Sequence, residues 1–237
     1  MSNHPTTGRG RATAAAAHPS GSGAFFDVDE TLIDTKSMFS FLEFYLRRCG
    51  EPPSTYQRLI QDLRALADRD IPRTQINRQY YRLYAGHDAR AVAQAGRDWF
   101  SSHLEQGLFI PETVHALHTH QTRGDFTVLL SGSFFACLDP IATHLDAHWA
   151  IGTRPVIRDG TLTGDIVTPM IGPAKARTAH ATAAVRALDL TASTAYGDHI
   201  TDLDLLNSVG HPVVVGHDPQ LHAHATTHGW RHLTPAA

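Results

Sequence analysis

The pattern of apolar and polar residues predicts a doubly wound α/β fold. Beyond residue 108, short apolar runs alternate with longer segments in which apolar residues recur every three or four positions. Short apolar runs are typical of buried parallel strands, and the longer spacing is typical of helices. Their alternation predicts a parallel sheet with helices on both faces. We predict strands at 24–26, 126–130, 149–151, 194–196 and 212–215, helices at 111–123, 134–146, 173–188, 202–209 and 219–228, and a hairpin at 154–165.

Residues 37–108 interrupt this alternation with a purely helical pattern. Prolines and glycines divide the segment into about four helices, since both residue types interrupt helical runs. We therefore predict a helical unit inserted into a core formed by residues 24–36 and 109–237. Residues 1–23 are rich in Ala, Ser, Gly, Thr and Pro and have almost no large apolar side chains, so we predict a disordered leader there.

Composition argues against several classes of partner. The formal net charge is -3 and the sequence has no basic stripe, so we expect no nucleic-acid partner. Cys49 and Cys137 lie far apart without CxxC spacing, which argues against a disulfide framework and a zinc site. No apolar run approaches the roughly 20 residues needed to span a bilayer, and the N-terminus lacks the apolar block of a secretory signal. We expect a soluble, cytoplasmic protein with no membrane partner.

Two residue types have unusual frequencies. The chain has 18 arginines but only two lysines, Lys36 and Lys175. Nucleotide bias in a GC-rich genome is the simpler explanation, but each remaining lysine is a candidate for a role that arginine cannot perform, because an ammonium and a guanidinium are not interchangeable. The 17 histidines show no convergent ligand pattern, so we expect His115, His118 and His120 to be surface residues rather than zinc ligands.

Polar residues directly follow three of the predicted strands. Ligands of open parallel sheets bind outside the carboxyl ends of the strands, where the loops converge. If the chain is an enzyme, its chemistry belongs at these positions. The segments concerned are Asp27 to Thr31, Ser131 to Ser133, and Gly197 to Asp202.

Asp27 and Asp29 suit two different roles in phosphate-ester chemistry. At a transition from strand to loop, both side chains can turn towards one pocket. One carboxylate can attack phosphorus and form an aspartyl phosphate, while the other protonates the leaving oxygen and later deprotonates water. The alternative interpretation is a pair of acids that cap the start of a helix.

Ser131, Gly132 and Lys175 are candidates for holding a phosphate. The Ser131 hydroxyl and nearby backbone N–H groups precede a predicted helix, whose N-terminus favours anions. Lys175 lies at the opening of another predicted helix, where its charge can neutralise both a phosphate and crowded carboxylates. The alternatives are an ordinary Ser-Gly turn and a solvated surface lysine.

Asp198 and Asp202 are candidate metal ligands. Their spacing of four residues puts both carboxylates on one face if a helix starts there. Mg2+ prefers oxygen ligands and is usually held by one or two carboxylates together with substrate phosphate, so a site built from Asp27, Asp198 and Asp202 is chemically reasonable. The alternative is a helix cap followed by a solvated acid.

The four motifs are, in chain order, Asp27 to Thr31, Ser131 to Ser133, Lys175, and Gly197 to Asp202. As an ordered set they resemble the motifs of the haloacid dehalogenase-like superfamily, and within it the phosphoserine phosphatase-like branch. The resemblance covers about residues 24 to 232 and implies a Rossmann-like core with a helical cap at 37–108. It also implies an Mg2+-dependent phosphomonoester hydrolase that works through an aspartyl phosphate. The implied roles are Asp27 as nucleophile, Asp29 as acid and base, Ser131 with Gly132 and Lys175 on the phosphate, and the Asp27 carboxylate, the Asp29 backbone carbonyl and Asp198 on Mg2+, with Asp202 in support.

Two residues depart from that branch and bear on the substrate. Lys36 stands where phosphoserine phosphatases have a glutamate that receives the substrate's amino group, and a cation cannot bind an ammonium. Phosphoserine is therefore disfavoured, and we expect Lys36 to meet an acidic or hydroxyl-rich group unless it is only part of a hinge. His199 replaces a small residue and either contacts the substrate or lines the loop. A sugar phosphate or nucleoside monophosphate is favoured as the small-molecule substrate.

Other functions on the same fold stay open at this point. One is phosphoryl transfer to another hydroxyl, as in a phosphomutase, and another is a catalytically silent binding module, against which the four motifs argue. A dehalogenase is disfavoured because Asp29 would have no leaving group to protonate. A homodimer is compatible with the sequence but is not indicated by any pattern in it.

Overall fold

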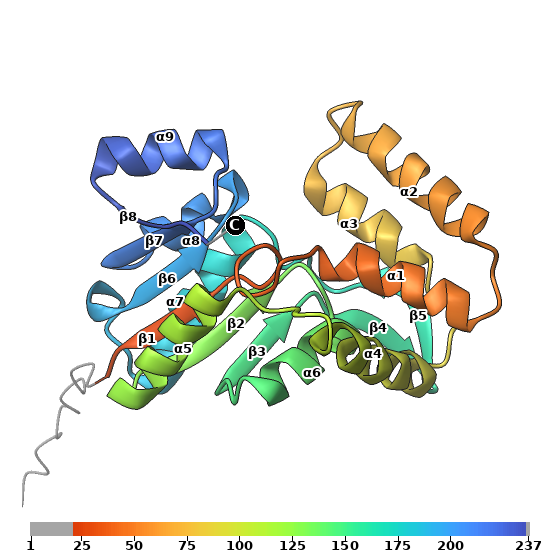
Figure 1. Cartoon of the computed structure of the whole chain (residues 1–237), viewed down its shortest axis with the longest axis horizontal. Helices are drawn as coiled ribbons and strands as arrows, with labels where there is room; N and C mark the ends of the chain where they lie inside the picture. Colours follow the sequence, from red (N-terminus) through yellow and green to blue (C-terminus); the bar gives the residue numbers. More distant parts are fainter. Residues whose placement is uncertain (1–20, 236–237) are drawn as a thin grey trace, which may run out of the picture.

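A six-stranded parallel sheet forms the centre of the structure, a computed structural model that describes residues 21–235. The strand order is β3-β2-β1-β6-β7-β8, with helices on both faces (Figure 1). This confirms the predicted doubly wound α/β fold. The strands are β1 Gly23–Phe26, β2 Phe126–Ser131, β3 Trp149–Gly152, β6 Thr194–Gly197, β7 His211–Val215 and β8 Arg231–Leu233, and a separate antiparallel hairpin consists of β4 Pro155–Arg158 and β5 Thr161–Ile166.

The helices fall into two groups along the chain. Four of them follow one another directly after β1, within residues 37–104, and the others connect or flank the strands. The first group is α1 Ser37–Arg48, α2 Pro53–Ala67, α3 Arg73–Arg82 and α4 Ala89–Leu104. The second group is α5 Pro111–Arg123, α6 Phe135–His144, α7 Pro173–Arg186, α8 Leu203–Asn207 and α9 Pro219–His228. Among residues 21–235, no helix is long and apolar enough to cross a membrane.

The structure departs from the predicted elements at three places. The strand β8 was not predicted, because it is a short edge strand with two polar residues and lacks the apolar run that marks a buried strand. The predicted helix 202–209 is instead a 3-10 turn at Ile200–Asp202 followed by the short α8. β1 begins at Gly23, and Gly21 pairs with Leu188, so structure starts before Ala24. Residues 1–20 of the predicted leader lie outside the described residues.

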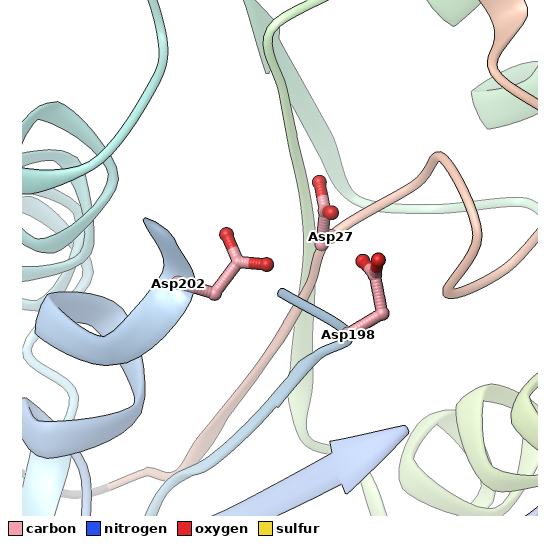
Figure 2. Close-up of side chains that lie close together, drawn as sticks. All are labelled: Asp27, Asp198 and Asp202. Atoms are coloured by element: carbon pink, nitrogen blue, oxygen red, sulfur yellow. The ribbon is translucent and has the colours of Figure 1, made fainter. Parts of the chain in front are cut away.

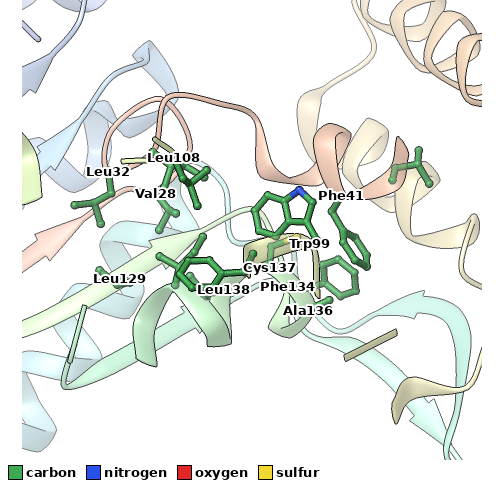
Figure 3. Close-up of a cluster of buried hydrophobic side chains, with 14 of the residues drawn as sticks. Val28, Leu32, Phe41, Trp99, Leu108, Leu129, Phe134, Ala136, Cys137 and Leu138 are labelled. Atoms are coloured by element: carbon green, nitrogen blue, oxygen red, sulfur yellow. The ribbon is translucent and has the colours of Figure 1, made fainter. Parts of the chain in front are cut away.

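The inserted helices share one apolar core with the sheet. Phe41 of α1 and Trp99 of α4 pack beside Phe134 and Cys137 (Figure 3). The helices α4 and α6 approach so closely that a Cβ atom at Gly96 would lie 1.9 Å from the Ala136 carbonyl oxygen. A close-packed interior has no room for such a side chain, so the glycine is what allows α4 to lie this close to α6. The helices α2 and α3 lie further from the sheet than α4 (Figure 1), but Leu63 of α2 and Tyr81 of α3 belong to the same core.

Candidate active site

Three neighbouring strands bring the predicted site residues together. β1 lies between β2 and β6, and their carboxyl ends are in register, with Phe26 opposite Leu129 and Tyr196. The backbone N–H of Asp27 donates to the Tyr196 carbonyl at 3.0 Å, so pairing continues one residue beyond β1. The residues that follow these strands therefore share one edge of the sheet, as open parallel sheets require of a ligand site.

Asp27, Asp198 and Asp202 form a compact carboxylate cluster. One oxygen from each lies within 4.8 Å of the others, and the side chains point towards a common space (Figure 2). Asp27 is 8% exposed and Asp202 is 1% exposed, while Asp198 is half-buried. Carboxylates that converge in this way repel one another unless a cation lies between them.

The cation that the chain itself supplies is Lys175. It is the third residue of α7 and only 5% exposed. Its Nζ lies 2.6 Å from Asp27 Oδ1 and 2.5 Å from Asp202 Oδ1. Burial lowers the pKa of the ammonium, but the charges of Asp202 and Asp27 outweigh it and raise the pKa above its usual range. Lys175 is thus a fixed positive charge that bridges two acids.

Burial and crowding also raise the pKa values of Asp198 and Asp202. Burial, followed by the charges of Asp27 and Asp202, raises the pKa of Asp198 to about 9. Thr31 donates its hydroxyl to Asp198 Oδ1 at 2.9 Å, which partly offsets that shift. Burial also raises the pKa of Asp202 to about 6, although Lys175 lowers it. More negative charge is gathered here than one lysine balances.

Asp29 lies beside this cluster but is not part of it. Burial raises the pKa of its carboxyl to about 7; hydrogen bonding to Ser37 lowers this pKa, and the charge of Asp27 raises it. Its Oδ1 is buried without a hydrogen-bond partner among residues 21–235. A carboxyl with a pKa near neutrality is suited to give and take a proton.

The Ser131–Gly132–Ser133 loop follows β2 at the same edge. Ser131 is buried, and its Oγ accepts the Ser133 backbone N–H at 3.0 Å. This leaves the Ser131 hydroxyl proton available to a ligand. The Gly132 carbonyl points to the inserted helices and accepts hydrogen bonds from α3.

The predicted shared helix face of Asp198 and Asp202 is wrong, although the two carboxylates do meet. Asp198 precedes the 3-10 turn, whose N-cap is His199. The His199 ring accepts the Thr201 N–H, and Asp202 Oδ2 accepts the His199 N–H at 3.4 Å. This reciprocal capping starts the turn after Asp198, so loop geometry rather than helical spacing brings the acids together.

A family model of haloacid dehalogenase-like hydrolases matches residues 24–207. The chain belongs to this family. Among its relatives, a probable phosphatase of Mycobacterium tuberculosis is 31% identical over 212 residues, which are 87% of this chain and 73% of that protein. A Streptomyces azureus protein named for inhibition of morphological differentiation is 30% identical over 216 residues, 87% of this chain and 76% of its own. The predictions of the family and of a hydrolytic enzyme are confirmed.

Solved structures share the fold of this haloacid dehalogenase-like hydrolase. A Bordetella pertussis protein of unknown function superposes with a TM-score of 0.81 at 26% identity, covering 90% of this chain and 98% of that one. A phosphoserine phosphatase with an analogue of its phospho-aspartyl intermediate has a TM-score of 0.64 at 18% identity, covering 86% and 90%. The second similarity concerns the fold alone.

The two residues predicted to select the substrate are partly exposed, and each contacts another side chain of the protein. Lys36 is the N-cap residue of α1 and pairs with Glu30 at 3.2 Å, with both side chains about half exposed. The His199 ring contacts Arg73 Nη1 at 2.9 Å, and burial followed by the Arg73 charge lowers the pKa of His199. The acidic group that Lys36 meets here is therefore one of the chain's own.

Sequence reasoning missed the contributions of α3 and one histidine. Arg73 and other polar residues of α3 reach the loops of the sheet, which their helical spacing alone does not reveal because a polar helix face is usually solvated. His120 was expected at the surface but is 7% exposed, which corrects that prediction. Its ring bonds Asp125 at 2.6 Å and the Tyr196 hydroxyl at 3.0 Å, and the acid five residues later was the overlooked signal.

Proposed function

We propose that the chain is an Mg2+-dependent phosphomonoester hydrolase that acts on a small phosphorylated metabolite through an aspartyl phosphate on Asp27. The observation that carries this proposal is the contact of buried Lys175 with Asp27 and Asp202 inside a cluster that also contains Asp198. A relative named as a probable phosphatase supports the reaction class.

The donor set fits a divalent cation. Three acids share one ammonium, and their crowding is, after burial, one reason why the pKa of Asp198 is raised to about 9; a phosphate dianion would add further negative charge. Mg2+ favours such oxygen ligands and would supply charge neutralisation for the incoming phosphate. Asp27 and Asp198 are the proposed carboxylate ligands, with the Asp29 backbone carbonyl. Asp202 already has partners on both oxygens, Lys175 and the His199 N–H, so its proposed role is to support the site.

The chain's own residues account for two successive displacements at phosphorus. A carboxylate oxygen of Asp27 attacks phosphorus while the bond to the ester oxygen breaks, and Asp29 gives that oxygen its proton. Asp29 then takes a proton from water, whose oxygen attacks the same phosphorus and releases phosphate from Asp27. Lys175 and the Ser131 hydroxyl hold the equatorial oxygens through both steps, where negative charge accumulates.

The inserted helices are proposed to act as a cap. Residues 37–108 carry α1 to α4, and α3 contacts the loops that follow β2 and β6, through Asn77 to Gly132 and through Arg73 to His199. A cap in this place excludes bulk water and selects the leaving group. A sugar phosphate or nucleoside monophosphate is the favoured substrate class, with phosphoserine disfavoured because of Lys36.

The activity test is phosphate release from p-nitrophenyl phosphate and from a panel of phosphorylated metabolites, with and without Mg2+. We expect hydrolysis that requires the metal and one or more metabolites preferred over the aryl ester. Parallel reactions with an added alcohol separate hydrolysis from phosphoryl transfer, since transfer would give a new ester in place of free phosphate. Absence of metal-dependent hydrolysis on every compound would refute the proposal.

Mg2+ is expected to stabilise the folded protein even without substrate. An ion at 100 times its dissociation constant adds about 2.7 kcal/mol to the free energy of unfolding when it binds only the folded state. Asp198→Asn should remove this Mg2+-dependent increase in Tm, while raising Tm without Mg2+ because one crowded acid is gone. Asp204→Asn, on the exposed side of α8, is the matched control and should keep the full shift. An unchanged Mg2+ shift in Asp198→Asn would contradict the proposed ligands.

Lys36→Glu is expected to change substrate preference more than turnover of a generic ester. The variant places two acids together where Lys36 now pairs with Glu30, so anionic leaving groups should be disfavoured. We expect kcat/KM for the preferred metabolites to fall by at least about tenfold relative to p-nitrophenyl phosphate, which corresponds to about 1.4 kcal/mol. Lys36→Met separates loss of charge from its reversal. Equal losses on all substrates would rule out a selectivity role.

A further inference from the structure

Two side chains of α3 hold one carbonyl of the Ser131–Gly132–Ser133 loop. Asn77 Nδ2 and the Tyr81 hydroxyl each donate to the Gly132 carbonyl oxygen at 3.0 Å. The two residues are four apart, so they lie one above the other on the same helix face. Asn77 is 5% exposed and Tyr81 is 2% exposed. This carbonyl thus has both of its acceptor positions filled from the inserted helices.

The same peptide unit acts on Ser131. The Gly132 carbonyl and the Ser133 N–H belong to one planar peptide, so fixing the carbonyl fixes the direction of the N–H. That N–H donates to Ser131 Oγ at 3.0 Å. Donors on the carbonyl also polarise the peptide and strengthen the bond its N–H makes. The position of the Ser131 hydroxyl therefore depends on Asn77 and Tyr81.

The fold alone does not explain an asparagine at this position. Asn77 Oδ1 is buried and has no hydrogen-bond partner among residues 21–235. A buried acceptor without a partner destabilises the folded state, and an apolar side chain of similar size would avoid this. The amide orientation is fixed because a carbonyl can only accept, so the NH2 group must face Gly132. The contribution of Asn77 is a second hydrogen-bond donor to the Gly132 carbonyl.

We propose that Asn77 and Tyr81 are positioning residues that orient the Ser131 hydroxyl for the phosphoryl group through the Gly132–Ser133 peptide. This inference rests on the proposed phosphatase function. The phosphate pocket then needs residues of both the sheet and the inserted helices. It is complete only while α3 contacts the Ser131–Gly132–Ser133 loop. Phosphate affinity and cap docking are then coupled, because each favours the same arrangement of this peptide.

Tyr81→Phe tests the inference with a matched control one residue away. The variant keeps the ring and removes one donor to Gly132. Tyr80→Phe removes an equally buried hydroxyl, which bonds the Met38 carbonyl and Tyr84 instead. With Mg2+ present, we expect the inhibition constant of inorganic phosphate to rise about five- to tenfold in Tyr81→Phe, the loss of about one hydrogen bond. In Tyr80→Phe it should stay within about twofold, with a similar loss of Tm in both variants.

A double-mutant cycle with Ser131→Ala distinguishes positioning from general support. If Tyr81 acts through Ser131, Tyr81→Phe should have little further effect on phosphate inhibition or kcat once the hydroxyl is gone. A second cycle combines Asn77→Leu with Ser131→Ala, and there too we expect little further effect on phosphate inhibition or kcat. Additive losses in both cycles, or equal effects of Tyr80→Phe and Tyr81→Phe, would overturn the inference. A wild-type chain without phosphatase activity would instead refute the proposed function.

Discussion

Replacing Asp27 with asparagine is expected to abolish Mg2+-dependent hydrolysis of p-nitrophenyl phosphate. The amide is a poor nucleophile at phosphorus and brings no negative charge to the metal, so both proposed roles are lost together. Removal of a nucleophile from a cooperating set costs on the order of a thousandfold or more in kcat. The measurement is the initial rate at saturating Mg2+, with kcat and KM determined separately.

Asp34→Asn is the matched control for this change. Asp34 lies seven residues further along the same segment but is exposed, and it should retain full activity. A Tm close to that of the wild type in both variants would show that charge removal as such has little effect on folding. Turnover by Asp27→Asn within about tenfold of the wild type would eliminate Asp27 as nucleophile, since that is far less than such a loss costs.

Lys175→Met is expected to produce the largest loss of stability of any single change in the site. It leaves Asp27 and Asp202 buried without their shared cation, and breaking a buried ion pair in this way costs about 3–5 kcal/mol. The free energy of unfolding, measured by denaturant titration without metal, should fall by that amount. Mg2+ should restore part of it, because the ion replaces some of the missing positive charge.

The other lysine of the chain provides the comparison. Lys36→Met removes a half-exposed pair with Glu30, which contributes less than about 1 kcal/mol. Lys175→Arg keeps the charge but replaces a compact ammonium with a planar guanidinium, and we expect it to lose activity even where it folds. If Lys175→Met and Lys36→Met unfold at the same denaturant concentration, Lys175 does not bridge the two acids.

Local signals explain why much of the fold could be predicted from the sequence. Pro111 begins α5 and Gly124 ends it in a left-handed conformation, with φ 83°. α9 is bounded in the same way by Pro219 and Gly229. Proline at the first helical position and glycine after the last are fixed by backbone sterics, which act within a few residues. The bounds of these two helices were accordingly predicted without error.

The site could be predicted in part for a different reason. The carboxyl ends of parallel strands lie at one edge, so Asp27, Ser131 and Asp198 were expected to meet before any contact was known. The contributions of α3 could not be found in this way. Whether Asn77 and Tyr81 face solvent or the loop depends on how the inserted helices dock on the sheet, and that docking is set by packing around Phe41 and Trp99 rather than by local sequence.

The most direct test of the mechanism is to stop the enzyme with acid during turnover and locate the phosphoryl group by peptide mass spectrometry. The account predicts an acid-stable fraction of protein that carries one phosphoryl group on the side chain of Asp27 and no other residue. Asp27→Asn should carry none. Steady hydrolysis by a wild-type enzyme that is never phosphorylated, or is phosphorylated at a different residue, would contradict the account.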